Sequence, residues 1–381
     1  MARVVQVRAA AVPLHAPGRN AAVDFAGLSG CLVAVVSDER RGGRAVTGFG
    51  LGAIGRLAHL DAIRQRLAPR LVERPEALDP ARARDLLTAN EKPGAHAERS
   101  AAVAAIEIAA WDLAAKLAEV PAYTLVANRL GLPAPSPAVS VYAAGGYYGG
   151  TAPLADEVRS YLEAGYEHVK IKVGGASLAE DLRRVEAVLA LLGGDGGRLA
   201  VDANGRLDPH ASVAYAEALR PYGLRWFEEP GDPLDYGLQA ELARRVDVPF
   251  ATGESVCSRQ ELRNLVRYAG LDPARDFLQM DPCLAYGAAE LAAMVADLRE
   301  LGWAPERVLP HGGTLVGLHL AAALALGGCE AYPGAFSPFG GFGPRARVER
   351  GALTIPEAPG FGFEEKPELR PFLARLAPES A

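Results

Sequence analysis

Seven ionisable residues follow short apolar runs at a nearly constant spacing in the C-terminal two thirds of the chain. They are Lys172, Asp202, Glu228, Glu254, Asp281, His311 and Glu330. Successive members lie 30, 26, 26, 27, 30 and 19 residues apart, which is about the length of one strand and one helix. Any one of them could simply cap the following helix, but seven in register disfavour that explanation. In a barrel of parallel strands they ring one pocket, because the carboxyl ends of the strands meet at one face.

The run HVKIKVGG at 168–175 predicts a strand with two lysines on one face. Residues two apart in a strand share a face, so Lys170 and Lys172 point one way and the aliphatic residues point the other. The aliphatic face suits the outside of a barrel, where helices pack, and the lysines then point inward. Two buried ammonium groups require compensating anions. The alternative is an exposed amphipathic strand with both lysines in solvent.

Carboxylates on the next three strands supply that compensation: Asp202, Glu228 and Glu254. A set of three carboxylates offers only oxygen ligands, which favours a hard cation such as Mg²⁺ over zinc. Without a cation the three groups would repel one another and raise one another's pKa. We therefore expect bound Mg²⁺. Asn204 shares the direction of Asp202 and could contact a ligand, whereas Glu229 points to the other face and braces the site.

A divalent cation beside two lysines suggests abstraction of a proton next to a carboxylate. The resulting enediolate carries two negative charges, which Mg²⁺ and an ammonium group can neutralise. Lysine acts as a base only if its pKa falls from about 10.4 toward about 7–8, and burial, a second lysine and Mg²⁺ all act in that direction. Lys172, nearer the strand end, is the expected base. Lys170 is expected to depress the pKa of Lys172 and to help hold the substrate carboxylate.

A second proton-transfer group is expected on the opposite side of the barrel. His311 follows the run VLP, and Asp281 closes the preceding strand. A carboxylate on one ring nitrogen fixes the tautomer of the imidazole and raises the basicity of the other nitrogen. The pair could also be an incidental loop feature. Opposite a lysine on the strand ring, however, it indicates an acid or base.

The elements that must position these residues change in character along the chain. From about residue 139, strand-like and helix-like segments alternate about eight times, which predicts a closed α/β barrel. The first ~125 residues instead mix strand-like runs at 31–38 and 45–52 with a long helix at 100–120, which indicates an α+β domain. The junction between the two parts is rich in proline: Pro133, Pro135 and Pro137.

Composition excludes several classes of partner. The 381 residues are 50% hydrophobic and carry a net charge of −6, which gives no basic surface for nucleic acid or for an anionic membrane. The four cysteines form no CxxC pair and suit a reduced compartment. No apolar run reaches the roughly 18 residues of a membrane span, and no signal peptide is recognisable. We expect a cytoplasmic homo-oligomer that acts on a small-molecule carboxylate.

Lysine is scarce in this chain. It occurs at five positions, whereas arginine supplies the other 35 basic residues: the lysines are Lys92, Lys116, Lys170, Lys172 and Lys366. Only lysine can lose its proton near neutral pH, so some of the five are candidates for chemistry. A biased genome composition with incidental lysines is the alternative.

Short motifs add a family resemblance over essentially the whole chain. In order, they are VKIKVGG, VDANG, FEEPGDP, ATGES, LQMD and PHGG. With the residues above, they resemble the enolase superfamily, mandelate racemase/muconate lactonizing enzyme family. Within it the chain is most similar to the D-tartrate dehydratases, through NEKPGAHAERS at 90–100, VYAAGGYYGG at 141–150 and GGCEAYPGAFSPFGGF at 327–342.

The resemblance implies an enolase-like architecture of three parts. An α+β capping domain is expected at 1–130, a (β/α)7β modified TIM barrel at 131–344, and a C-terminal segment at 345–381 that returns to the cap. It also implies Mg²⁺ on Asp202, Glu228 and Glu254, with Lys172 as the base and the His311–Asp281 pair as the acid.

The resemblance further implies a set of substrate contacts. Glu330 is expected at the substrate carboxylate, and Lys92 is expected to contact the substrate from the cap. The sequence departs from the tartrate pattern at three positions, where polar side chains are replaced: Gly52, Ile54 and Thr314. A pocket that loses hydrogen-bonding partners should bind the small, polar tartrate less well.

The expected activity is that of a Mg²⁺-dependent dehydratase, a hydro-lyase, acting on D-tartrate or on a related diacid or acid sugar. Lys172 removes the C2 proton and His311 protonates the departing C3 hydroxyl, so that the enol product becomes a 2-keto acid. A racemase or epimerase could use the same pair to exchange a proton at C2 without elimination. A catalytically silent binding protein on the same barrel is the alternative of a different class.

Overall fold

A ring of parallel strands occupies the C-terminal two thirds of the computed structural model, which describes residues 2–16, 18–53, 59–150 and 152–377. Six strands lie side by side in chain order: β4 (Ala138–Gly145), β5 (Val169–Lys172), β6 (Leu199–Asp202), β7 (Trp226–Glu228), β8 (Phe250–Thr252) and β9 (Phe277–Leu278). β10 (Cys329–Ala331) pairs in parallel with the other side of β4. Between β9 and β10, Val308 bridges to Leu278. The ring therefore closes with eight members.

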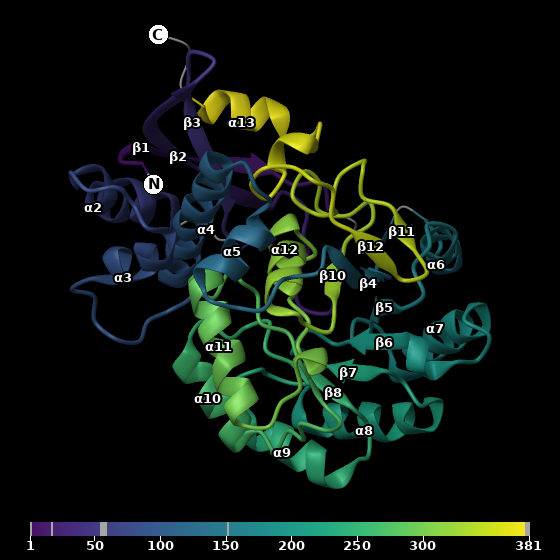
Figure 1. The fold of residues 1–381 in the computed structure, drawn as a ribbon. Helices are drawn as coiled ribbons and strands as arrows, with labels where there is room; N and C mark the ends of the chain where they lie inside the picture. Colours follow the sequence, from purple (N-terminus) through teal and green to yellow (C-terminus); the bar gives the residue numbers. More distant parts are fainter. Residues whose placement is uncertain (1, 17, 54–58, 151, 378–381) are drawn as a thin grey trace.

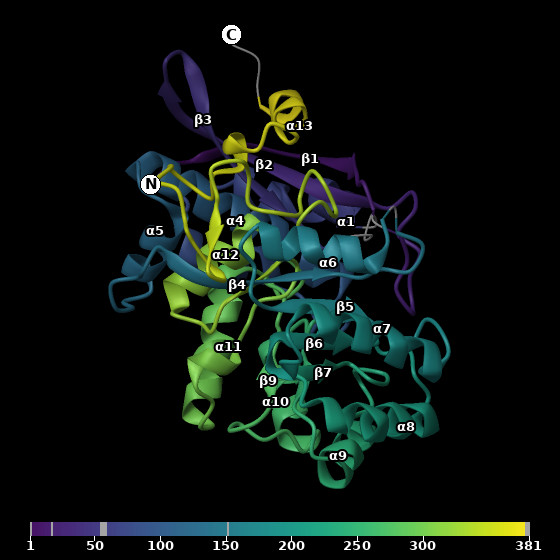
Figure 2. The same cartoon turned by 90° about the vertical axis from the view of Figure 1, so that its right-hand side faces the viewer.

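A helix follows each of the first seven members of this ring (Figures 1 and 2). The helices are α6 (Leu154–Glu163), α7 (Leu178–Leu191), α8 (Pro209–Leu219), α9 (Tyr236–Arg245), α10 (Arg259–Tyr268), α11 (Ala288–Glu300) and α12 (Leu315–Leu324). Five of them begin after a Ser, Thr or Asp whose side chain accepts a hydrogen bond from a backbone N–H of the first turn. The predicted (β/α)7β barrel is confirmed.

The N-terminal part is an antiparallel sheet covered by one long helix. The sheet has the order β1 (Val4–Pro13), β2 (Ser29–Arg41) and β3 (Arg44–Leu51), and α4 (Glu98–Ala118) packs on it. Two glycines of β3 permit this close contact. A Cβ atom on Gly48 would lie 2.1 Å from Ala109 O, and one on Gly50 would lie 2.2 Å from Ala105 O. The alanine-rich sequence of α4 therefore packs its backbone directly onto the strand.

Shorter elements complete this capping part. They are α1 (His59–Asp61), a π-helical turn (Ala62–Leu67), α2 (Pro69–Val72), α3 (Ala83–Thr88) and α5 (Ala122–Arg129). Figure 2 shows the capping sheet at one end of the molecule, beside the barrel. Among the helices described, none is long and apolar enough to cross a membrane.

The C-terminal segment contacts both parts. β11 (Val348–Glu349) and β12 (Ala352–Thr354) form a hairpin whose second strand pairs antiparallel with β4. Phe361 N then donates to Asp112 Oδ1 of α4 at 2.8 Å. α13 (Arg370–Leu376) lies against β1 and β2, as Figure 1 shows in yellow.

A buried carboxylate of the cap contacts the barrel directly. Glu107 of α4 is fully buried and accepts hydrogen bonds from Ala288 N at 2.9 Å and Ala289 N at 3.0 Å, the first residues of α11. Trp111 Nε1 donates to the same side chain at 2.8 Å. Burial raises the pKa of Glu107 to about 7, although these three hydrogen bonds oppose the rise. The cap helix thus supplies the N-terminal cap of a barrel helix.

Replacing this carboxylate should destabilise the protein. We expect Glu107→Ala to lower the free energy of unfolding in urea by about 3 kcal/mol, because hydrogen bonds to charged groups contribute about 1.5–3 kcal/mol and buried N–H groups lose their acceptor. The exposed Glu73 offers a matched control, and Glu73→Ala should stay within about 0.5 kcal/mol of the parent. Equal free energies of unfolding for the two variants would contradict the stabilising role of Glu107.

Candidate active site

The register of the barrel strands places the first three chemical groups side by side. Lys172 pairs with Asp202 across β5 and β6, and Asp202 pairs with Glu228 across β6 and β7. The side chains of Lys170 and Lys172 are buried and face the interior of the barrel, where they contact these acids. The predicted inward orientation is confirmed, and the alternative of an exposed amphipathic strand is wrong.

Lys170 neutralises the acids beneath the pocket. Its side chain is 1% exposed, and Nζ lies 2.6 Å from Glu228 Oε1, 2.8 Å from Glu330 Oε1 and 3.8 Å from Asp202 Oδ2. Burial lowers its pKa, but Glu228 and Glu330 outweigh burial and hold the pKa well above the usual value. Lys170 is not among the residues that line the cavity between the strand ends and the cap. Its expected contact with a substrate carboxylate stays a prediction.

Lys172 reaches the cavity and pairs with one acid. Its Nζ lies 2.5 Å from Asp202 Oδ2 and 5.3 Å from the ring centre of Tyr147. Burial lowers its pKa, but Asp202 more than compensates, so the pKa is raised above the usual value. In the chain without a cation the short distance to Asp202 outweighs burial and the repulsion by Lys170. The lowered pKa expected with Mg²⁺ bound stays a prediction.

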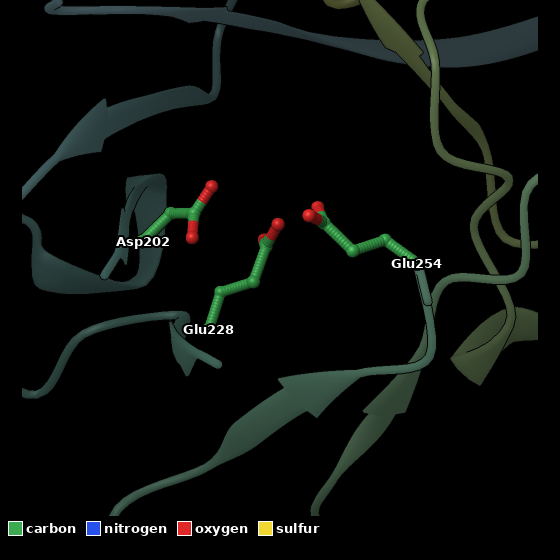
Figure 3. A group of neighbouring side chains, drawn as sticks. All are labelled: Asp202, Glu228 and Glu254. Carbon is green, nitrogen blue, oxygen red and sulfur yellow. The ribbon is translucent and has the colours of Figure 1, made fainter. Parts of the chain in front are cut away.

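Three acids converge on one point beside this lysine. Asp202, Glu228 and Glu254 each direct a carboxylate oxygen inward, and these oxygens lie within 4.8 Å of one another (Figure 3). Trp226 Nε1 and Gln279 Nε2 each donate to Glu228 Oε2 at 2.9 Å and fix its orientation. Burial and the neighbouring Asp202 raise the pKa of Glu228 to about 7. The donor set is all oxygen and strained by mutual repulsion, which fits a hard divalent cation.

Two neighbours of these acids lie where their sequence positions place them. Asn204 lines the cavity, and its backbone N and Nδ2 donate to Asp202 at 2.8 and 3.1 Å. Glu229 is buried and lines a separate small cavity beside Leu242 of α9. Burial and Glu254 raise its pKa well above the usual value. Asn204 therefore orients Asp202 from the pocket side, whereas the bracing role expected of Glu229 stays a prediction.

The imidazole of His311 stands among acids on the far side of the ring. Its Nδ1 lies 3.2 Å from Asp281 Oδ2, and Nε2 lies 3.2 Å from Glu254 Oε2. Burial lowers its pKa, but Glu254 and Glu330 outweigh burial and raise the pKa of His311 to about 10. The predicted pair with Asp281 is formed.

A tyrosine that sequence reasoning missed also contacts this imidazole. Tyr332 OH lies 3.3 Å from His311 Nε2 and lines the same cavity. Tyr332 follows Glu330 by two residues on the same chain segment, so the two-residue spacing of a strand was the signal that could have revealed it.

Two expected substrate contacts lie outside the cavity. Glu330 is fully buried and accepts a hydrogen bond from Gly312 N at 2.9 Å. Burial raises its pKa, but Lys170 and His311 outweigh burial and lower it to about 2. Glu330 is thus a counter-ion for these two groups. Lys92 is exposed and lines a separate cavity beside Tyr286, because its loop runs toward the start of α11 and away from the strand ends.

A cavity of about 470 Å³ lies between the strand ends and the cap. Its barrel side contains the polar groups Lys172, Asn204, Glu254, Asp281, His311 and Tyr332. Much of the opposite wall is apolar and was not predicted: Val23, Phe25, Leu28, Leu51, Phe336 and Phe339. This volume lies in the usual range for small-molecule sites, about 300–1,000 Å³.

The three departures from the tartrate pattern differ in their surroundings. Gly52 lines the cavity, and a Cβ atom there would lie 3.1 Å from Cε1 of His59. Thr314 also lines the cavity, but its hydroxyl accepts a hydrogen bond from Gly317 N and caps α12. Ile54 lies outside the described residues.

Comparison with known proteins matches both parts of the chain. Residues 5–127 match the mandelate racemase / muconate lactonizing enzyme N-terminal domain, and residues 153–369 match the enolase C-terminal domain-like family. The L-talarate/galactarate dehydratase of Salmonella typhimurium is 30% identical over 347 residues, 89% of this chain and 82% of that protein. The arabinonate dehydratase of Saccharolobus solfataricus is 28% identical over 272 residues, 69% of each chain.

A solved structure is similar over nearly the full length. The crystal structure of L-talarate dehydratase from Polaromonas sp. JS666, complexed with Mg and L-glucarate, superposes with a TM-score of 0.76. It is 25% identical and covers 100% of this chain and 98% of its own. The predicted family and a magnesium-binding fold are thereby confirmed. These three relatives are dehydratases of acid sugars, and none of the three is a tartrate dehydratase.

Proposed function

Because the chain belongs to the mandelate racemase / muconate lactonizing enzyme family, we propose that it is a Mg²⁺-dependent dehydratase of an acid sugar or related hydroxy acid. One observation carries the proposal. A single cavity is lined by the side chains of Lys172 and His311, with the converging carboxylates of Asp202, Glu228 and Glu254 beside them. Elimination of water next to a carboxylate needs a base, an acid and a cation, and this arrangement can supply all three.

Asp202, Glu228 and Glu254 would hold the cation. Their converging oxygens and the raised pKa of Glu228 support this assignment. A cation bound there would supply positive charge that stabilises the anion developing at the substrate carboxylate.

Lys172 and His311 would divide the proton transfers. The neutral amine of Lys172 would take the C2 proton. Burial and the neighbouring Lys170 favour that neutral form, and Asp202 opposes it. The C3–O bond then breaks, and the imidazolium of His311 gives its proton to the departing hydroxyl, which leaves as water. Asp281 on Nδ1 holds the ring in orientation throughout. The enol that remains becomes a 2-keto acid.

The cavity favours a substrate longer than tartrate. Its capping wall is largely apolar, Gly52 offers no polar side chain, and the Thr314 hydroxyl is engaged at a helix terminus. In the division we propose, residues 1–130 and the end of the barrel domain at 131–344 select the substrate, and the strand ends perform the chemistry. The segment at 345–381 links the two. D-tartrate remains the smallest candidate substrate.

Racemisation or epimerisation of a hydroxy acid is the second candidate. Lys172 and His311 line one cavity, so each could deliver a proton to C2 from its own side. This reaction would invert the substrate without forming a 2-keto acid.

Removal of divalent cations should abolish turnover, and Mg²⁺ should restore it. We expect Glu228→Gln to weaken Mg²⁺ binding by at least about tenfold, because it removes one of three charged ligands. Titration calorimetry of chelator-treated protein measures this affinity without an assay of turnover. Glu357→Gln, at an exposed acid, is the control and should bind Mg²⁺ like the parent. Full turnover in chelator-treated protein would refute the metal site.

Separate variants should uncouple proton abstraction from elimination. His311→Asn should slow dehydration by about 10²–10⁴-fold, the usual contribution of a general acid, yet retain exchange of the C2 proton in deuterated water. Lys172→Ala should lose both reactions. Proton NMR follows the exchange, and semicarbazone formation follows the 2-keto acid. A His311→Asn enzyme that dehydrates at the normal rate would remove His311 from the mechanism.

A library of acid sugars and hydroxy diacids tests the substrate class. We expect the highest kcat/KM for an acid sugar of more than four carbons, with 2-keto acid formation and polarimetry measured in parallel. A value for D-tartrate above about 10⁴ M⁻¹s⁻¹, with no acid sugar near it, would contradict the preference for length. Inversion without 2-keto acid would establish the racemase, and no reaction with any member would indicate a silent binding protein.

A further inference from the structure

One of the scarce lysines has no place in the chemistry described above. Lys366 belongs to the C-terminal segment, yet its side chain is among the most deeply buried of the chain, with 1% exposure. Its Nζ donates to three consecutive backbone carbonyls, those of Phe339 at 3.0 Å, Gly340 at 2.6 Å and Gly341 at 2.9 Å. An ammonium group has three N–H donors, so these acceptors satisfy it completely.

These three carbonyls belong to a segment that lines the active-site cavity. Phe336 and Phe339 both line that cavity. The Phe336 ring packs edge to face against Phe25 at 5.0 Å and against Tyr332 at 4.9 Å. Residues 335–341 therefore touch the cap on one side and, through Tyr332, the neighbourhood of His311 on the other.

The same segment is fitted closely to the capping sheet. A Cβ atom on Gly30 of β2 would lie 2.1 Å from the Phe339 ring, so the ring occupies the space that a side chain would take. His15 N donates to Ser337 O at 2.9 Å. Gly340 and Gly341 follow directly, and glycine leaves a chain conformationally free unless other contacts restrain it. Three carbonyl dipoles that converge on one point also repel one another without a positive charge between them.

On this basis we propose that Lys366 is a positioning residue for substrate selection. Its ammonium group gathers the carbonyls of residues 339–341 and so holds Phe336 and Phe339 against the distal part of the substrate. The nature of the substrate in this inference rests on the proposed function. The hydrogen bonds by which Lys366 holds residues 339–341 do not depend on any reaction.

Two variants and two measurements test the proposal. Lys366→Met keeps most of the length and the apolar stem of the side chain and removes the charge, and Glu357→Gln changes an exposed acid of the same C-terminal segment as the control. Hydrogen exchange followed by mass spectrometry should show faster exchange in the peptide that spans 335–343 of Lys366→Met, with barrel peptides unchanged. Faster exchange throughout the chain, or no change in this peptide, would overturn the proposal. This measurement needs no substrate, so it tests the role of Lys366 even if the protein is not a dehydratase.

Kinetics on the best acid sugar give the second measurement. We expect Lys366→Met to raise KM by about tenfold and to leave kcat within about twofold, because the apolar wall binds the distal part of the substrate equally in the ground state and the transition state. A parallel fall in kcat for every substrate would indicate a general structural role and overturn the proposal. Assays belong at about pH 7, because burial lowers the pKa of Lys366 to about 8 and the ammonium form is required.

Chemical rescue distinguishes the hydrogen bonds from simple packing. In Lys366→Ala, added ethylammonium should lower the raised KM, because it restores a cation with three N–H donors in the carbonyl cradle. Tetramethylammonium has the charge but no N–H donor and should not. Equal rescue by both cations would contradict the role of the three hydrogen bonds.

Discussion

The balance of charge inside the barrel determines what the rest of the structure must do. Asp202, Glu228, Glu254 and Glu330 face the side chains of two lysines and one histidine, and most of these groups are buried. Burial of so many carboxylates is unfavourable unless each has a partner. The pKa of Glu228 is nevertheless raised to about 7, by burial and by the neighbouring Asp202. Glu228 is also one of the three acids whose oxygens converge, so positive charge is needed at the place that is shaped to receive it.

The barrel and the cap contribute different kinds of wall to the cavity. Strand ends hold Lys172 and Asp202 within a rigid hydrogen-bonded sheet, which suits groups that must be placed to within fractions of an ångström. Loops such as that of Phe25 contribute apolar surface that can vary without disturbing the sheet. The C-terminal segment connects the two walls, since Phe361 is bound to α4 and Lys366 to the barrel loop at 339–341. The residues proposed for catalysis and those proposed for substrate selection thus lie in different parts of the structure, and the C-terminal segment contacts both parts.

Structural features that repeat at a fixed spacing could be predicted from the sequence, whereas features without such a repeat could not. The alternation around Lys172 and the regular spacing of strand ends predicted the barrel, because strand geometry repeats every two residues and each unit has a similar length. Depth along a strand has no such signature, so the sequence could not show that Glu330 lies beneath the cavity. The path of the loop that carries Lys92 is likewise set by tertiary contacts. The pKa of Lys172 depends on one short distance to Asp202, which spacing alone does not encode.

The capping of α11 by Glu107 has a consequence for how such proteins diversify. A barrel helix whose first N–H groups are satisfied by a residue nearly two hundred positions earlier cannot be recombined freely with a new cap. Gly287 must stay without a side chain for the same reason, since a Cβ atom there would lie 2.0 Å from Glu107 Oε2. The cap and the barrel are therefore linked through the contact between Glu107 and the start of α11. A chimaera that exchanged the cap or the barrel without matching residues 107 and 287 would lose these hydrogen bonds or place a side chain where there is no room for it.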